Sequence, residues 1–377
     1  MALRAKRGVL ALRMMPRSAA QAALRRPLAR GARGARGVAS AAAAAAPPRS
    51  PWRRAAPLLL AAPLVGGSLF VQQQHAARAD AGVPDSAQPG EHEGEGAVAW
   101  GAFELAAYKL VPLRLLSMVW GWVTAVDMPW LLRKQVFLGW AAAFDCKLDE
   151  MRDPLEIHQN LAEFFMRRIK VGARPMADVE LVSPADGEVV QVCEVDGDVV
   201  VQVKGITYSL SALLGRAPPT SRSKRLMCAT VYLSPGDYHR FHSPADFELA
   251  SSRHYSGYLF SVSSFIMRAV PGLLAINERV VLDGTWAGGY FGMVAVAATN
   301  VGNIRLVADP ELRTNRFPSE QAEPLAFEPA CAVGKGDEVG TFRLGSTIVI
   351  VAEAGDMEWA VKPGQKVQVG EALIRAK

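Results

Sequence analysis

Residues 342–351 read FRLGSTIVIV, and the apolar, β-branched run after Gly345 is typical of a strand in a protein core. A glycine inside such a pattern lowers stability and usually marks a bulge or a close approach of backbone. Ser346 follows it, and a serine hydroxyl becomes a nucleophile when a histidine takes its proton and an aspartate orients that histidine. Taken alone, the Gly-Ser pair indicates a bulge more readily than a site.

Further strand-like runs begin at about Val179 and include LMCATVYL at 226–233. Asp196 and Gly197 separate two of these runs and predict a hairpin turn, since both tolerate positive φ. Short helices are expected at 153–169 and 209–214. Two segments near the end, KGDEVGTF and KPGQKVQVGEAL, each repeat a turn, a strand and a glycine. The prediction is an α+β fold with a β-rich core, N-terminal amphipathic helices and small hammerhead- or barrel-like C-terminal hairpins.

Two histidines three residues apart lie in YLSPGDYHRFHSPAD, residues 232–246. Proline and glycine punctuate this segment after a predicted strand, so His239 and His242 lie on a turn where both rings can face one cavity. Imidazole is the side chain best suited to moving protons near neutral pH. The pair is a candidate for acid–base catalysis, with a structural role as the alternative.

Another candidate is Asp186 in SPADGEVV, residues 183–190. A Pro-x-Asp-Gly sequence is in the first place a turn. An aspartate at the start of a strand can also orient a histidine and favour its charged form. In isolation the turn is the stronger interpretation.

The charges divide sharply between the two ends of the chain. Residues 1–79 contain 14 Lys or Arg and no Asp or Glu, whereas the remainder holds 28 basic and 36 acidic side chains. The acidic body argues against nucleic acid as a partner. The Arg- and Ala-rich residues 1–54 are typical of a mitochondrial transit peptide, with a disordered basic tail as the alternative.

Residues 55–77 are mostly apolar and follow the basic leader. At ~1.5 Å per residue, the run 55–71 reaches roughly 25 Å, slightly less than the ~30 Å hydrocarbon layer. We expect a single membrane-spanning anchor here, and a continuation of the leader is the alternative. Arginines on its N-terminal side favour an N-terminus in the matrix and a body across the mitochondrial inner membrane. Residues 78–99 then form a linker rich in Gly, Pro and acids.

Residues 100–145 carry five tryptophans and a few basic side chains among leucines and valines. Because Trp favours the headgroup zone of a bilayer, the segment predicts helices that lie on a membrane surface. The alternative is a helical subdomain packed on the core.

Known metal and nucleotide signatures are missing from the printed sequence. The four cysteines show no Cys-x-x-Cys pair, and the cysteines and histidines do not fall at zinc spacings, so no metal site is predicted. There is also no G-x-G-x-x-G, Walker or G-x-S-x-G sequence, which leaves the common nucleotide cofactors unsupported.

An ordered series of segments across residues 100–377 resembles the membrane-bound phosphatidylserine decarboxylases of mitochondria and bacteria. The series runs FFMRRIKVGARP, SPADG, KGITYSLSALLG, YLSPGDYHRFHSP, INERVV, VAVAATNVGNI, KGDEVGTFRLGST and VKPGQKVQVGEAL. So many strings in one order leave little room for chance similarity. The segment SVSSFIMRAVPG, residues 261–272, departs most from the family pattern.

The resemblance implies an inactive proenzyme that cuts itself between Gly345 and Ser346. Ser346 would attack the Gly345 carbonyl and leave a β chain ending at Gly345. The α chain, residues 346–377, would start with a pyruvoyl group made from Ser346. Asp186 and His242 match the family's carboxylate and base for that serine.

The resemblance also assigns His239 to the decarboxylation step. The pyruvoyl group would form a Schiff base with phosphatidylserine and accept the electron pair left by CO2, so that phosphatidylethanolamine is the product. The implied partners are phosphatidylserine in the membrane and the α and β chains of one precursor, and a homodimer is left open. Residues 146–377 would be the catalytic domain, facing the intermembrane space.

Two other hypotheses use the same residues. A membrane-anchored serine hydrolase would employ Ser346, His242 and Asp186 and remain a single chain. A non-enzymatic carrier module would account for the repeated Gly-containing turns but leave the two histidines without a role.

Overall fold

The structure is a computed structural model that describes residues 102–195, 197–201, 207–219, 225–300, 303–316, 324–343 and 346–377. These residues belong to one compact unit of the chain. The expected transit peptide (1–54), anchor (55–77) and linker (78–99), and Gly345 at the expected cleavage bond, lie outside the described residues. No helix within the described ranges is long and apolar enough to cross a bilayer.

Strands make up most of the described chain. They are β1 (Leu181–Val182), β2 (Gly187–Val195), β3 (Val199–Val201), β4 (Thr207–Ser209), β5 (Arg225–Leu233), β6 (Arg240–His242), β7 (Phe247–Tyr255), β8 (Arg279–Trp286), β9 (Gly289–Val296), β10 (Ile304–Leu306), β11 (Leu325–Val333), β12 (Glu338–Phe342), β13 (Ser346–Ala354), β14 (Met357–Trp359), β15 (Lys366–Val367) and β16 (Ala372–Ala376).

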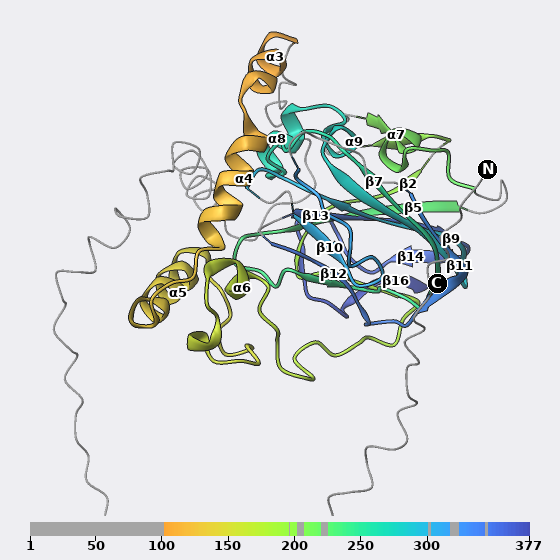
Figure 1. Ribbon diagram of the computed structural model, residues 1–377. Coiled ribbons are helices and arrows are strands. Elements are labelled where there is room, and N and C mark those ends of the chain that lie inside the picture. Colours follow the sequence, from red (N-terminus) through yellow and green to blue (C-terminus); the bar gives the residue numbers. More distant parts are fainter. Residues whose placement is uncertain are drawn as a thin grey trace, which may run out of the picture. The chain divides into compact units, whose positions relative to one another are not determined.

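The largest sheet is antiparallel throughout and has the order β11-β7-β8-β9-β13-β5-β2-β15. Three smaller sheets have the orders β1-β16-β14, β10-β12-β6 and β3-β4. Because β11 and β15 end the large sheet without pairing to each other, the sheet is open in the described chain. The β-rich architecture with few helices confirms the predicted α+β class (Figure 1).

Two finer expectations have different outcomes. Strands β14, β15 and β16 join open sheets, so the hammerhead- or barrel-like character of the C-terminal hairpins stays a prediction.

The expected hairpin around Gly197 is wrong in its pairing: β3 pairs with β4, whereas β2 pairs with β5 along its length. The ladder between β2 and β5 already satisfies the backbone of β2 on one edge, and β4 offers β3 a separate partner.

Strand β13 is buried at every position because it lies between β5 and β9 near the middle of the large sheet. The apolar run from Thr347 to Ala352 therefore packs on both faces of the sheet and does not alternate with polar residues. This burial places Ser346, the first residue of β13, inside the core.

Helices lie mainly before the strands. They are α3 (Ala102–Leu110), α4 (Leu113–Thr124), α5 (Trp130–Phe144), the 3-10 turn η2 (Leu155–Ile157), α6 (Leu161–Phe165), α7 (Leu210–Leu214), α8 (Ser264–Ala269) and α9 (Leu273–Ile276). Figure 1 shows α3, α4 and α5, in orange to olive, along one side of the strands.

Polar contacts attach α4 to the strand region. Arg114 forms an ion pair with the buried Glu278 at 2.7 Å, and the Ser117 hydroxyl accepts a hydrogen bond from the Asn300 amide at 2.9 Å. In contrast, many apolar side chains of α3–α5 are exposed, with Phe103 at 82% and Trp130 at 74%. A surface of this kind is typical of contact with a membrane or a partner.

A small second core joins α5 to α6 and consists of Phe137, Ala141, Met151, Leu161 and Phe164. The Phe137 and Phe164 rings stack at 5.0 Å between centroids. On the neighbouring turn of α5, Trp140 contacts Phe165, which belongs to the main core. The helical segment is thus packed on the strands through a few buried aromatic side chains.

Gly187 begins β2 at a point where no side chain fits. A Cβ atom there would collide with the carbonyl oxygen of Tyr232 on β5. We expect Gly187→Ala to lower the free energy of unfolding by roughly 1–3 kcal/mol, since the strands must separate to admit the methyl group. Urea unfolding of the full chain measures this. Gly139→Ala is the matched control, because Gly139 is exposed in α5 with nothing within 4 Å of the added atom; an equal loss in both variants would contradict the steric account.

Candidate active site

The candidate residues converge because three strands meet at one end of the large sheet. Strand β5 is antiparallel to both β2 and β13, so its last residue, Leu233, lies beside the first residues of both. Leu233 pairs with Ser346, and Tyr232 pairs with both Thr347 and Glu188. Asp186, two residues before Glu188, therefore lies at the same end as Ser346, with the backbones of β2 and β13 roughly 10 Å apart.

Ser346 is fully buried, and its hydroxyl has no hydrogen-bond partner among the described residues. A buried hydroxyl without a partner carries a desolvation cost of roughly 1–3 kcal/mol. Pairing with β5 holds the backbone of Ser346. The hydroxyl is therefore fixed in position without a hydrogen bond of its own to any described residue.

The loop that follows β5 carries both histidines toward this end of the sheet. The Asp237 carboxylate accepts hydrogen bonds from the Ser234 amide at 2.7 Å and the Ser234 hydroxyl at 2.8 Å, which closes the turn. Burial raises the pKa of Asp237. Gly236 is required at the tip, since a Cβ atom there would collide with the carbonyl oxygen of Phe144 at the end of α5. Helix α5 thereby supports the loop.

His239 lies in this loop and is fully buried. Its Nδ1–H donates to the Asp237 carbonyl at 2.8 Å, because that oxygen can only accept, and its Nε2 has no partner among the described residues. Burial lowers the pKa of His239 to about 3, and the nearby Arg167 charge acts in the same direction. The imidazole is therefore neutral at pH 7, with an unshared electron pair on Nε2.

The backbone of His239 also lies close to the segment before Ser346. Its carbonyl accepts a hydrogen bond from the Phe342 amide at 3.0 Å, and Phe342 ends β12 four residues before Ser346. The loop thus starts at Leu233, which pairs with Ser346. At His239 it contacts Phe342, which lies just before Ser346 in the chain.

His242 ends β6 and has both ring nitrogens occupied. Nδ1–H donates to the Gly336 carbonyl at 2.9 Å, and Nε2 accepts from the Tyr238 hydroxyl at 3.1 Å. Burial raises the pKa of Tyr238, so the phenol keeps its proton and donates it. Burial also lowers the pKa of His242.

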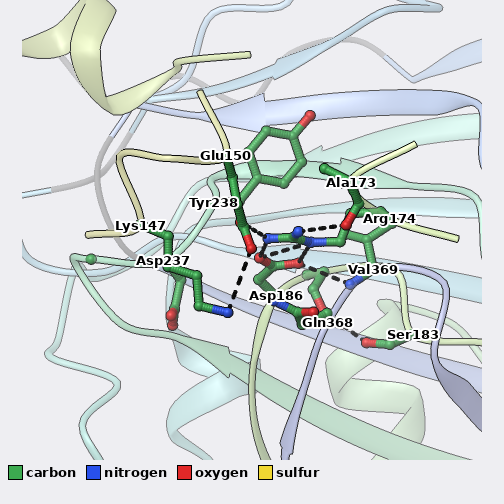
Figure 2. Close-up of polar contacts among 12 residues, drawn as sticks. Lys147, Glu150, Ala173, Arg174, Ser183, Asp186, Asp237, Tyr238, Gln368 and Val369 are labelled. Carbon is green, nitrogen blue, oxygen red and sulfur yellow. Dashed lines mark hydrogen bonds and ion pairs between the residues drawn. The ribbon is translucent and has the colours of Figure 1, made fainter. Parts of the chain in front are cut away.

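Asp186 is buried and held by several donors, as Figure 2 shows. The Arg174 guanidinium makes a two-pronged contact with it, with Nε at 2.9 Å from Oδ1, and the Val369 amide donates to Oδ1 at 2.9 Å. Arg174 also donates to Glu150 at 2.6 Å. Burial alone would raise the pKa of Glu150, but the hydrogen bond and charge of Arg174 together with Lys147 outweigh it, and the pKa is lowered.

The structure brings the expected residues to one region, but hydrogen bonds do not connect all of them. The His242 amide donates to the Pro184 carbonyl at 2.8 Å, which puts His242 beside the Asp186 turn. However, no hydrogen bond connects Asp186 with the His242 ring, or either of them with Ser346, among the described residues. Asp186 is instead committed to Arg174 and Val369.

Sequence analysis missed the groups that hold the site together: Arg174, Glu150, Asp237, Tyr238 and Arg167. Tyr238 and Asp237 lie in the histidine segment, and Arg167 and Arg174 lie in FFMRRIKVGARP, so the quoted strings contained these four. A buried arginine cannot be told from an exposed one by its place in a string, because only its contacts reveal the burial. Glu150 lies outside every quoted string.

The pKa of His239 makes stability depend on pH. Its folded value of about 3 is below the unfolded value near 6.5, so the stabilisation is complete above pH 6.5 and is lost as the pH falls toward 3. Between pH 7 and pH 5 the wild type should lose about 2 kcal/mol of unfolding free energy through this residue alone. Urea unfolding of His239→Asn at the two pH values should show that much less loss. An identical loss in both proteins would show that His239 does not titrate in this way.

Comparison with known proteins adds a family to this geometry. The family model described as Phosphatidylserine decarboxylase matches residues 161–375. The mitochondrial phosphatidylserine decarboxylase proenzyme of Cricetulus griseus is 39% identical over 301 residues, covering 72% of this chain and 74% of the relative.

Plant and yeast relatives match over similar shares. The mitochondrial phosphatidylserine decarboxylase proenzyme 1 of Oryza sativa subsp. japonica is 35% identical over 346 residues, covering 72% of this chain and 79% of its own. The proenzyme 1 of Schizosaccharomyces pombe is 35% identical over 364 residues, with 73% and 83% covered. Since the family model spans more than half of the chain and these relatives align over most of their length, the chain belongs to the phosphatidylserine decarboxylase family.

Proposed function

We propose that this chain is a phosphatidylserine decarboxylase proenzyme, which forms phosphatidylethanolamine and CO2 after cutting itself at Gly345-Ser346. The observation that carries the proposal is the Ser346 hydroxyl, which is fully buried at the first position of a central strand and has no hydrogen-bond partner among the described residues. A hydroxyl in that state is available to a neighbouring electrophile, and the preceding peptide carbonyl is the nearest one along the chain.

The proposed maturation is an acyl shift followed by elimination. The Ser346 oxygen attacks the Gly345 carbonyl carbon, and the peptide bond to the Ser346 nitrogen is replaced by an ester. Elimination releases the β chain with a carboxylate at Gly345 and leaves a dehydroalanine at position 346. Hydrolysis of that residue releases ammonia and leaves a pyruvoyl group at the start of the α chain.

The surroundings suit a small neutral group derived from Ser346. The position is enclosed in the core, and the described residues include no cation bound to the serine side chain. The pyruvoyl carbonyl supplies the electron sink for the pair of electrons that CO2 leaves on the substrate. His239 Nε2 is buried and has no hydrogen-bond partner among the described residues, and we assign this nitrogen to proton transfer at the reacting carbon.

The neutral state of His239 defines the order of its proton transfers. Because burial holds its pKa at about 3, Nε2 starts as a proton acceptor. It can take a proton from the substrate ammonium, which must be neutral to react with a carbonyl, and return a proton to the carbon after CO2 has left. An anionic substrate bound nearby would favour the protonated form.

The two chains would stay together after the cut. The α chain contains β13, which pairs with β5 on one side and β9 on the other, so its removal would open the large sheet. Strand β16 pairs with β1, and the Val369 amide donates to Asp186. Every one of these contacts joins a residue after 345 to one before it.

The competing serine hydrolase would use Ser346, His242 and Asp186. Burial of Ser346 at the start of a central strand is compatible with attack on the adjacent peptide, which needs no access from outside. Burial does not separate the two functions, because the substrate of the decarboxylase must also reach position 346. The family match favours the decarboxylase.

Membrane association follows from the helical segment that we assign to residues 100–145. Its exposed side chains include Phe103, Leu115, Trp122 and Trp130, and a bilayer would cover them. The compared relatives carry the word mitochondrial in their names. Within this proposal residues 1–54 are a transit peptide, 55–77 an inner-membrane anchor and 78–99 a linker. The catalytic domain, 146–377, faces the intermembrane space, and a homodimer stays a prediction.

Intact mass of the purified protein tests self-cleavage. The wild type should give two polypeptides, with residues 346–377 as the smaller one and a ketone-reactive group at its start. Ser346→Ala should give one uncut chain, since no oxygen is available for the acyl shift. Ser261→Ala, in a half-buried loop serine, is the control and should be cut normally. A single wild-type chain that decarboxylates phosphatidylserine would refute the mechanism.

The roles of the other three residues separate maturation from turnover. Asp186→Asn and His242→Ala should slow the appearance of the α chain by at least tenfold, because they are assigned to activation of Ser346. His239→Ala should allow cleavage but lower decarboxylation of phosphatidylserine by roughly 100-fold or more. Cleavage is followed by gel and turnover by released CO2. Normal turnover in His239→Ala would remove that residue from the mechanism.

A further inference from the structure

A cavity of about 200 Å³, widely open to solvent, lies beside the histidine loop, and arginines outnumber carboxylates in its lining. Its charged lining residues are Arg152, Arg167, Arg168, Arg240, Asp153 and Glu163. A cavity of this size is larger than a single water molecule needs, and it can hold a small anion. The excess of arginine indicates that the anion would be the favoured occupant.

Some of these charged side chains form ion pairs or hydrogen bonds with carboxylates or amides, and others do not. Asp153 pairs with Arg152 at 2.8 Å, and Arg240 pairs with Glu338, which is outside the lining. Glu163 accepts a hydrogen bond from the Gln159 amide at 2.7 Å. Arg167 and Arg168 have no ion pair with a carboxylate in the described part of the chain.

Arg167 differs from the other arginines because it is buried, with only 4% of its surface exposed. Its Nη2 donates to the carbonyls of Gly236 at 2.7 Å and Asp237 at 3.2 Å, and its guanidinium lies over the Phe164 ring at 5.4 Å. Its Nη1 is buried and has no hydrogen-bond partner among the described residues. A buried guanidinium nitrogen that lacks an acceptor is unfavourable. Arg167 lines the cavity, so an anion there would lie beside this guanidinium.

Arg167 links the cavity lining to His239. The Asp237 carbonyl oxygen accepts hydrogen bonds both from Arg167 Nη2 and from His239 Nδ1. Because both nitrogens bond the same oxygen, they lie within about 6 Å of each other. A ligand held by Arg167 would therefore extend toward the imidazole of His239.

We propose that this cavity binds the phosphodiester of the phosphatidylserine headgroup, with Arg167 as its main contact and Arg168 as a second one. The proposal rests on the proposed function, which supplies a substrate with two anionic groups. In that substrate the phosphorus is three bonds from the reacting α carbon, a separation of roughly 4 Å. The phosphate must then bind close to the proton-transferring residue, as Arg167 is to His239.

The chemistry of the reaction favours the phosphodiester over the carboxylate as the group that the arginines bind. The carboxylate loses its charge as CO2, so an arginine that bound it would stabilise the starting state more than the transition state and slow the reaction. The phosphodiester keeps its charge throughout. Binding it strengthens attachment of the substrate without raising the barrier.

The test uses the matured full chain and two small competitors of phosphatidylserine in mixed micelles. Glycerophosphoethanolamine carries the phosphodiester but no carboxylate, and serine carries the carboxylate but no phosphate. The variants are Arg167→Gln, Arg167→Lys and Arg168→Gln. Arg375→Gln is the control, since Arg375 is an exposed arginine on β16 outside the cavity lining.

Arg167→Gln should weaken inhibition by glycerophosphoethanolamine, and raise KM, by roughly 10- to 100-fold, because one charge-assisted contact is lost. In the matured enzyme, inhibition by serine should stay within twofold. Arg167→Lys should recover part of the loss, and Arg168→Gln should show a smaller loss of about 3-fold, as expected for an exposed contact. Arg375→Gln should match the wild type.

Each other outcome overturns the proposal. Unchanged inhibition by glycerophosphoethanolamine in both Arg167→Gln and Arg168→Gln would mean that the cavity holds only water. Weakened inhibition by serine alone would assign the cavity to the carboxylate. If Arg167→Gln fails to fold or to cut itself, Arg168→Gln and Arg167→Lys decide the question. A wild type that does not decarboxylate phosphatidylserine would instead refute the proposed function, while binding of glycerophosphoethanolamine could still be measured directly by calorimetry.

Discussion

The antiparallel pairing of β13 with β5 and β9 is the constraint on which the site depends. Because every residue of β13 is buried, its first residue is carried into the core together with the rest of the strand. The same pairing sets Ser346 opposite Leu233, and the loop after Leu233 holds His239. The Ser346 hydroxyl is thus positioned by the pairing of its strand with β5 and β9, and not by a hydrogen bond of its side chain to any described residue.

Arginines organise the polar groups around this strand end. Arg174 binds Asp186 and Glu150 together, and Asp186 in turn accepts the amide of Val369 from the C-terminal segment. Arg167 binds two carbonyls of the loop that carries His239. Buried carboxylates and buried guanidinium groups are costly alone, and the pairing of Asp186 with Arg174 offsets part of that cost. The helical segment takes part as well, because the end of α5 packs against Gly236 of the same loop.

Much of the fold could be predicted where a segment is buried on both faces. The runs at 226–233 and 347–353 are continuous and apolar, and they form β5 and β13 within one or two residues. Strand β7 and edge strand β11 gave no such signal, because β7 alternates buried and exposed residues and β11 is exposed at most positions. The pairing of β3 with β4 was missed since local turn propensity reports only on neighbours in sequence.

The sequence by itself determined the residue types of the site, the family and the β-rich class, because these depend on the order of side chains along the chain. Tertiary structure alone decided which side chains are buried and which atoms they bond. It paired Asp186 with Arg174 and His242 with the Tyr238 hydroxyl. It left the Ser346 oxygen, His239 Nε2 and Arg167 Nη1 without a hydrogen-bond partner among the described residues. The physical reason is that burial and hydrogen bonding arise from strands and loops distant in sequence, whose register no local pattern encodes.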